Sequence, residues 1–217
     1  MRHVVYLHGF ASSAKSTKAA FFAVRLVEHG IPLHTPDFNE PDFSTLTITR
    51  MIRQVAELIG ELPPGPITLI GSSLGGFVAV QTALAQEASG GRAIDRLVLL
   101  APALDFSGNR TRDLGDRGLA EWESTGELNV FHYGYGRLIP VHYGLYSDAG
   151  GYDCVNAALG MPILIFQGKR DTAVDPSSVE SWARPRPNVE LHLLDDDHQL
   201  GSSLDYMWRE VRRFLDL

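Results

Sequence analysis

Short apolar runs alternate with longer segments of helical periodicity along most of this chain, and this alternation constrains the fold more than any other feature. The apolar runs, about five to eight residues long, are too short for helices and indicate strands buried on both faces. In the intervening segments apolar residues recur every three or four positions, as in amphipathic helices. Strands that alternate with helices predict a mainly parallel sheet with helices on both faces.

The expected elements can be placed by their residue numbers. Strands are expected at residues 3–7, 32–35, 67–71, 96–101, 162–166 and 189–194. Helices are expected at residues 16–29, 45–60, 74–88 and 202–215. The last helix is expected to begin with a capping pair, because Ser202 precedes Asp205 by three residues.

Composition and charge exclude several classes of protein. The chain has 217 residues, of which 44% are hydrophobic and 21% charged, as in ordinary globular domains. Its net charge of −7 provides no basic surface for nucleic acid, and no apolar run approaches the ~20 residues that span a bilayer. Cys154 is the single cysteine and cannot form an internal disulfide. With no metal-ligand motif and no secretory leader, we expect a cytoplasmic, metal-free single domain over residues 1–217, monomeric or homodimeric.

One segment interrupts the alternation. About 60 residues separate the strand at 96–101 from the strand at 162–166, roughly twice the length of a usual crossover. Residues 130–133 and 141–143 within it are expected to pair as a hairpin. The segment turns aromatic through Trp122, Phe131, Tyr133, Tyr135, Tyr143 and Tyr146. Long insertions of this kind are usually lids or binding loops; a surface excursion that covers a sheet edge is the alternative.

Residues 71–75 read Gly-Ser-Ser-Leu-Gly and lie directly between a buried strand and a helix. A serine on such a sharp turn adopts a strained backbone, and its hydroxyl projects above the sheet. Glycines two residues to either side avoid clashes with the neighbouring strand and helix. Ser73 fits this frame, whereas Ser72 would have Ile70 and Leu74 at its glycine positions. The pattern favours Ser73 as a nucleophile, with a plain glycine-rich turn as the alternative.

A nucleophilic serine needs a general base and a carboxylate that orients the base. His198 follows the strand at 189–194, which places it at the carboxyl edge of the sheet, where Ser73 also lies. Asp171 follows the strand at 162–166 and is the expected acid, with Asp175 as the alternative.

The oxyanion that forms during acyl transfer needs two backbone N–H donors. Leu74 follows the nucleophile at a helix N-terminus, where the helix dipole favours negative charge. The loop after the first strand supplies the second donor, and Gly9 allows its backbone to approach closely. We expect the N–H of Phe10 to be that donor, and His8 to brace the loop.

These motifs together resemble the α/β-hydrolase superfamily. The resemblance is carried by residues 8–10 (His-Gly-Phe), the turn at 71–75, and the chain order Ser73, Asp171, His198. Residues 7–13 also resemble the small bacterial esterases of the YqiA-like group. The resemblance implies a three-layer α/β-hydrolase fold, with a mainly parallel sheet of about six to seven strands and a lid at about residues 104–157.

The resemblance and the candidate residues predict a serine hydrolase that cleaves small carboxylic esters with short to medium acyl chains, without a cofactor. The predicted triad is Ser73, His198 and Asp171. Candidates for binding the acyl chain are Phe131, Tyr133, Tyr135 and Val174. One alternative is a thioesterase for acyl-CoA or acyl-protein; another is a non-catalytic hydrolase-fold receptor or interaction module.

Overall fold

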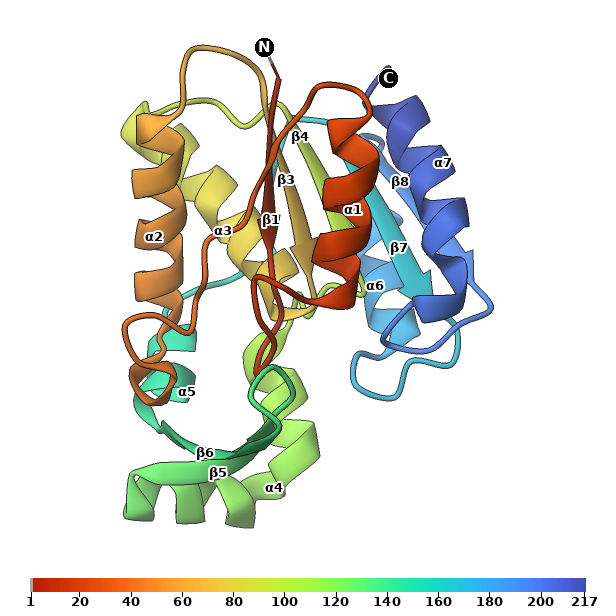
Figure 1. Cartoon of the computed structure of the whole chain (residues 1–217). Coiled ribbons are helices and arrows are strands. Elements are labelled where there is room, and N and C mark those ends of the chain that lie inside the picture. The colour runs from red at the N-terminus through yellow and green to blue at the C-terminus, as the bar shows by residue number, and fades with distance from the viewer. Residues whose placement is uncertain (1) are drawn as a thin grey trace.

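The computed structural model describes residues 2–217, and its central feature is a six-stranded parallel sheet (Figure 1). The strands are β1 (His3–Leu7), β2 (Leu33–His34), β3 (Ile67–Ser72), β4 (Arg96–Leu100), β7 (Ile163–Gly168) and β8 (Val189–Leu194). Their order across the sheet is β2-β1-β3-β4-β7-β8, and every neighbouring pair is parallel. The prediction of a mainly parallel sheet of six to seven strands is confirmed.

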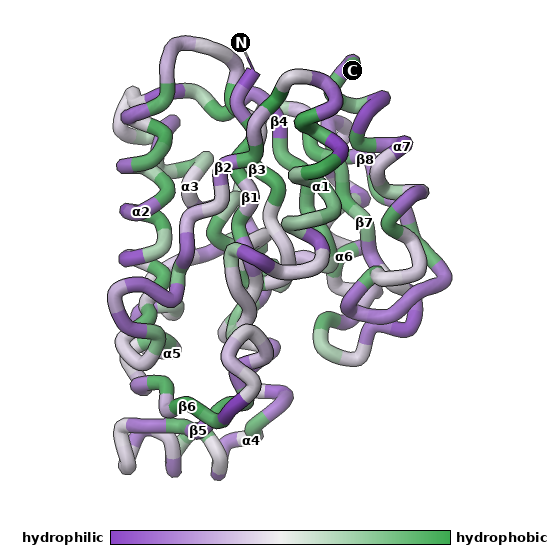
Figure 2. Tube along the Cα trace, viewed as in Figure 1, coloured by the Kyte–Doolittle hydropathy of each residue, from purple (hydrophilic) through white to green (hydrophobic). Residues whose placement is uncertain are grey.

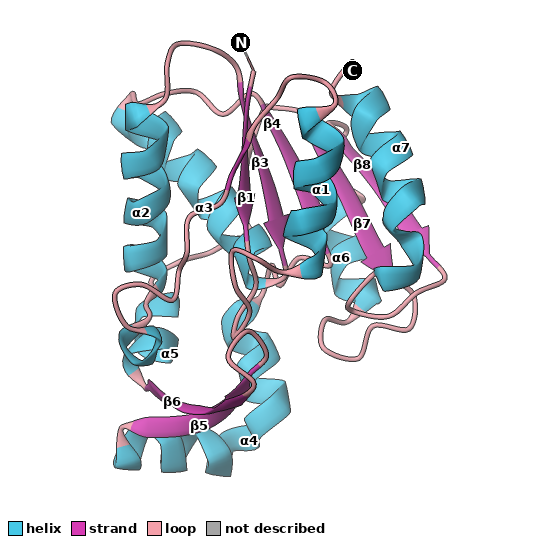
Figure 3. Ribbon diagram, viewed as in Figure 1, coloured by secondary structure: helices cyan, strands magenta, loops and turns pink. Residues whose placement is uncertain are grey.

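Helices cover both faces of this sheet, as expected (Figure 3). The α-helices are α1 (Thr17–Val27), α2 (Ile48–Glu61), α3 (Leu74–Ser89), α4 (Phe106–Thr125), α5 (Gly144–Ala149), α6 (Pro176–Ala183) and α7 (Leu204–Phe214). Alternate strand residues divide between two cores: α1 and α7 share one with Val4 and Val98, while α2, α3 and α6 share the other with Val5 and Leu97. None of the helices in the described part of the chain combines the length and apolar composition that crossing a bilayer requires.

The hydropathy of the helices matches this layered arrangement. Figure 2 shows hydrophobic residues gathered along the central strands, whereas α2 and α7 alternate between hydrophobic and hydrophilic positions. In α2 the buried residues are Ile48, Met51, Val55 and Ile59, which lie three or four positions apart and face the core. The apolar stripe that predicts the helix is therefore the face that packs on the sheet.

Two predicted helix starts differ from the structure. Residues Phe43–Thr45 form a 3-10 turn, and α2 begins only at Ile48, where the Thr47 side chain accepts from the N–H of Arg50. The capping pair predicted for the last helix is wrong. Ser203 occupies the N-cap position, and its hydroxyl donates to Asp196 instead of the helix backbone.

The segment between β4 and β7 forms α4, a hairpin and α5 (Figure 1). The hairpin consists of β5 (Glu127–His132) and β6 (Arg137–His142), paired antiparallel, and lies beyond the carboxyl ends of the sheet strands. This confirms the expected hairpin, with longer strands than the sequence indicated. The helix α4 was not expected, because this polar segment contains three glycines, and its backbone departs from helical geometry at Gly115.

Cys154 lies buried against α3, and its Sγ accepts a hydrogen bond from Gln81 at 3.2 Å. Burial raises the pKa of the thiol to about 12. Because the thiolate is the reactive form, the native protein should react with iodoacetamide at mildly alkaline pH only as fast as it unfolds. Mass spectrometry measures the rate of alkylation of the folded protein without urea and of the unfolded protein in urea. Rapid alkylation without urea would contradict the buried position.

Candidate active site

Ser73 lies on the turn that joins β3 to α3. Its backbone angles are φ 52° and ψ −116°, a strained conformation for a residue with a side chain. The neighbouring backbone holds this turn, since the N–H of Ser73 donates to the Leu100 carbonyl and its own carbonyl accepts from Ala103. Because Ser73 directly follows the last residue of β3, its half-buried side chain lies at the carboxyl edge of the sheet.

The two flanking glycines are required by close backbone approaches. A Cβ atom on Gly71 would collide with the carbonyl of Gly75, and a Cβ atom on Gly75 would collide with the carbonyl of Leu7 in β1. Backbone atoms of strand and helix cannot move aside as the end of a flexible side chain can. These contacts agree with the expectation that side chains at positions 71 and 75 would clash with the neighbouring strand and helix.

The Gly75→Ala variant should lose about 4 kcal/mol of stability or more, because the added methyl group collides with β1. Gly60→Ala is the matched control, since nothing lies within 4 Å of its added Cβ and alanine is favoured in the helix α2 by up to ~1 kcal/mol. Urea unfolding measures both variants. Equal stability of the two would show that the turn is less crowded than described.

The structure brings together the three residues proposed from sequence as nucleophile, base and acid. The His198 Nε2 lies 3.1 Å from the Ser73 Oγ, and the His198 Nδ1 lies 2.8 Å from the Asp171 Oδ2. His198 is 21% exposed, whereas the Asp171 side chain has no exposed surface. The three side chains come from the loops that follow β3, β7 and β8, at one edge of the sheet.

Both oxygens of Asp171 are held by further hydrogen bonds. Its Oδ1 accepts from the backbone N–H groups of Ala173 and Val174, at 2.9 and 2.8 Å, and its Oδ2 accepts from Gln167 Nε2 at 2.8 Å. Burial by itself raises the pKa of Asp171, but the bonds from His198, Val174 and Gln167 outweigh it and hold the pKa below its ordinary value. The carboxylate is therefore ionised and directs the Nδ1–H of His198 toward itself.

Asp175, the alternative acid, has a different partner. Its carboxylate caps α6, accepting from the Ser177 N–H at 2.9 Å and from the Ser177 hydroxyl at 2.7 Å. These bonds from Ser177 hold the pKa of Asp175 below its ordinary value. The geometry favours Asp171 as the partner of His198.

The loop after β1 lies against the Ser73 turn. A Cβ atom on Gly9 would lie 3.3 Å from the Ser73 Cβ, so the loop backbone and the nucleophile turn are neighbours. Within residues 2–217, the N–H groups of Phe10 and Leu74 donate to no protein acceptor. His8 braces this loop as expected, because its ring nitrogens contact the Gly9 carbonyl at 2.9 Å and the Phe38 N–H at 3.0 Å.

The structure separates the candidates for acyl-chain binding. Phe131 is 48% exposed and lies opposite Leu138 on one face of the hairpin, while Tyr133 is 77% exposed at its tip. Tyr135 is also exposed and stacks on the ring of His132. Val174 is buried, and its N–H holds Asp171.

The other face of the hairpin carries the apolar residues that pack toward the core: Leu128, Val130 and Ile139. The period-2 alternation of a strand explains this difference between Val130 and Phe131, whereas aromatic character alone does not. Two buried polar residues were also missed: Gln167, which contacts Asp171, and Asn39, which contacts the loop after β1. Neither belongs to a recognisable motif.

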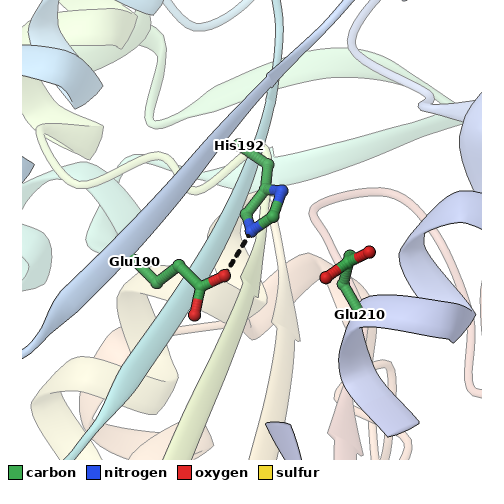
Figure 4. A group of neighbouring side chains, drawn as sticks. All are labelled: Glu190, His192 and Glu210. Atoms are coloured by element: carbon green, nitrogen blue, oxygen red, sulfur yellow. Dashed lines mark hydrogen bonds and ion pairs between the residues drawn. The ribbon is translucent and has the colours of Figure 1, made fainter. Parts of the chain in front are cut away.

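A separate cluster of possible metal ligands lies between β8 and α7 and contains Glu190, His192 and Glu210 (Figure 4). His192 is already paired with Glu190 at 2.7 Å. Arg213 contacts both glutamates, and Arg209 contacts Glu210 at 3.0 Å. These guanidinium groups already balance the carboxylate charge, so the cluster is explained as an ion-pair network.

A model of the family described as "Uncharacterised protein family (UPF0227)" matches residues 3–215. The chain belongs to the UPF0227 family. This agrees with the predicted YqiA-like resemblance. Among curated proteins, this UPF0227 chain is 33% identical to the lipase LipV of Mycobacterium tuberculosis over 102 residues, which is 44% of this chain and 38% of that lipase.

Solved structures show that this UPF0227 protein has the α/β-hydrolase fold. A putative hydrolase from Agrobacterium vitis S4 is 25% identical, with a TM-score of 0.80 over 98% of this chain and 87% of that one. The α/β hydrolase domain-containing protein 10 from mouse is 19% identical, with a TM-score of 0.81 over 99% and 89%. Est1E from Butyrivibrio proteoclasticus with ferulic acid bound is 19% identical, with a TM-score of 0.80 over 99% and 88%.

Proposed function

We propose that this protein is a serine hydrolase that cleaves carboxylic esters of short to medium acyl chains. The observation that carries the proposal is the continuous hydrogen-bonded path from the Ser73 Oγ through His198 to the ionised Asp171. The α/β-hydrolase fold supports it, as does the similarity to a putative hydrolase from Agrobacterium vitis and, over part of the chain, to the lipase LipV.

In the first step the Ser73 Oγ attacks the ester carbonyl carbon, and His198 Nε2 accepts the hydroxyl proton. Asp171 remains ionised and stabilises the imidazolium that forms. The negative charge on the carbonyl oxygen is stabilised by the N–H of Phe10, in the loop after β1, and by the N–H of Leu74, at the N-terminus of α3. The tetrahedral intermediate then expels the alcohol, which takes the proton from His198 and leaves an acyl group on Ser73.

In the second step water replaces the alcohol. His198 accepts a proton from the water as its oxygen attacks the acyl carbon, and the same two N–H groups stabilise the second oxyanion. Collapse of this intermediate breaks the bond to the Ser73 Oγ, which regains its proton from His198. One ester and one water thus give one acid and one alcohol.

The acyl chain lies, in this proposal, against the face of the hairpin that carries Val130 and Ile139. Each buried methylene contributes about 0.8 kcal/mol, which is close to fourfold in kcat/KM. Activity should therefore rise from acetyl to butyryl or hexanoyl p-nitrophenyl esters and then become constant. The Val130→Ala and Ile139→Ala variants should reduce this rise, whereas Phe131→Ala on the exposed face should not.

Hydrolysis rates for p-nitrophenyl esters and for acyl-CoAs of matched chain length test the proposal. We expect the esters to have the higher kcat/KM. Faster hydrolysis of acyl-CoAs would instead favour a thioesterase. No turnover of either series, together with no reaction with a fluorophosphonate probe, would favour the non-catalytic alternative. A rise in activity that depends on Phe131 instead of Val130 would place the acyl chain on the opposite face of the hairpin.

A further inference from the structure

The tip of the hairpin, residues 133–136, is hydrogen-bonded to the loop that follows β1. The backbone N–H of Tyr133 donates to the Ala11 carbonyl at 2.8 Å, and the side chain of Asn39 donates to the next carbonyl, that of Ser12, at 2.9 Å. Ala11 is buried and has a positive φ of 53°. Two segments distant in sequence thus hold consecutive carbonyls of a strained loop, and Figure 1 shows this loop reaching the hairpin tip.

A hydrogen bond between the side chains of Asn39 and His132 links the two segments that hold the Ala11 and Ser12 carbonyls. The His132 Nε2 lies 3.0 Å from the Asn39 Oδ1, and the His132 Nδ1 accepts from the backbone N–H of Tyr135 at 3.2 Å. Since Nδ1 is an acceptor, the ring proton is on Nε2 and is donated to Asn39. This bond orients the Asn39 amide so that its NH₂ group faces the Ser12 carbonyl.

Burial and ring packing leave this pair little freedom. Asn39 is 3% exposed and His132 is fully buried. The His132 ring is stacked on Tyr135, with centroids 4.1 Å apart, and forms a T-shaped pair with Phe43, with centroids 4.6 Å apart. Phe43 in turn packs on Phe10, with centroids 5.6 Å apart. The packed path therefore runs from the hairpin tip to the residue proposed as an oxyanion donor.

We propose that Asn39 and His132 are positioning residues, which hold the loop at residues 9–13 so that the Phe10 N–H points to the oxyanion. The inference rests on the proposed function, since it assigns part of that site. Oxyanion donors are effective only when they are fixed before the reaction. A misplacement of about 1 Å can cost on the order of 10²-fold in rate. Because the oxyanion exists only after attack, the loss falls on kcat and not on KM.

The Asn39→Ala and His132→Ala variants should each lower kcat by about 10- to 100-fold and leave KM for a p-nitrophenyl ester within about twofold. The double variant should lose little more than either single one, because the two side chains act as one unit. His132→Gln, which keeps a donor toward Asn39, should recover part of the rate. Asn129→Ala, at an exposed position of β5, is the matched control and should be unchanged.

A trifluoromethyl ketone inhibitor separates positioning from a general loss of structure, because its adduct with Ser73 carries the oxyanion. Its Ki should rise in parallel with the loss of kcat/KM across the variants. Unchanged kcat and Ki in Asn39→Ala and His132→Ala would overturn the inference, as would a loss that follows only the melting temperature. A wild-type protein that neither hydrolyses esters nor binds the ketone would overturn the proposed function as well.

Discussion

Replacing Ser73 with alanine should lower kcat for ester hydrolysis by a factor of about 10⁴ to 10⁶, since the members of a triad act as a unit. The variant removes the hydroxyl oxygen that lies 3.1 Å from His198 Nε2. The fold should be retained, because the backbone bonds of the turn do not use the Ser73 hydroxyl. Steady-state kinetics and a circular dichroism spectrum measure both effects.

Ser72→Ala is the matched control for this prediction. Ser72 is the neighbouring serine at the end of β3 and is 5% exposed, so it has the same chemistry but little access to substrate. The variant should retain most of the activity. The opposite result, with Ser72→Ala inactive and Ser73→Ala active, would mean that the frame of the turn is misassigned.

The Asp171→Asn variant should lower kcat by about 10⁴-fold. The N–H groups of Ala173 and Val174 both point at Oδ1, so the remaining carbonyl oxygen of the asparagine takes that position and its NH₂ group faces His198. This stabilises the ring tautomer with its proton on Nε2, which cannot accept the proton of Ser73. The kinetics of the variant at neutral pH measure the loss.

Asp175→Asn is the corresponding control and should have nearly full activity, because Asp175 caps α6 and asparagine is also a good capping residue. Equal losses of kcat in the two variants would mean that both carboxylates serve His198, or that the loop after β7 is arranged differently.

Features that depend on local sterics could be predicted from the sequence. The turn around Ser73 requires glycine at 71 and 75 because backbone atoms are in close contact there. This requirement is visible in the sequence as the five-residue pattern at 71–75. The approach of Asp171 and His198 to Ser73 follows from parallel topology, since the carboxyl ends of all strands in a parallel sheet lie at the same edge.

Features that depend on tertiary packing could not be predicted in the same way. The helix α4 buries only Phe106, Asn109 and Trp122, so it lacks a continuous apolar stripe. Tertiary contacts support it, including the bond from Trp122 Nε1 to the Val141 carbonyl. Asn39 and His132 are 93 positions apart, and only the folded chain shows that they are paired and buried.

Covalent labelling of the wild-type protein tests the central proposal most directly. The protein is treated with a fluorophosphonate probe, digested, and analysed by mass spectrometry to locate the adduct. We expect one adduct, on Ser73, that also forms in Ser72→Ala but is absent from Ser73→Ala and greatly slowed in Asp171→Asn. An adduct on another residue, or full labelling of Ser73→Ala, would contradict it.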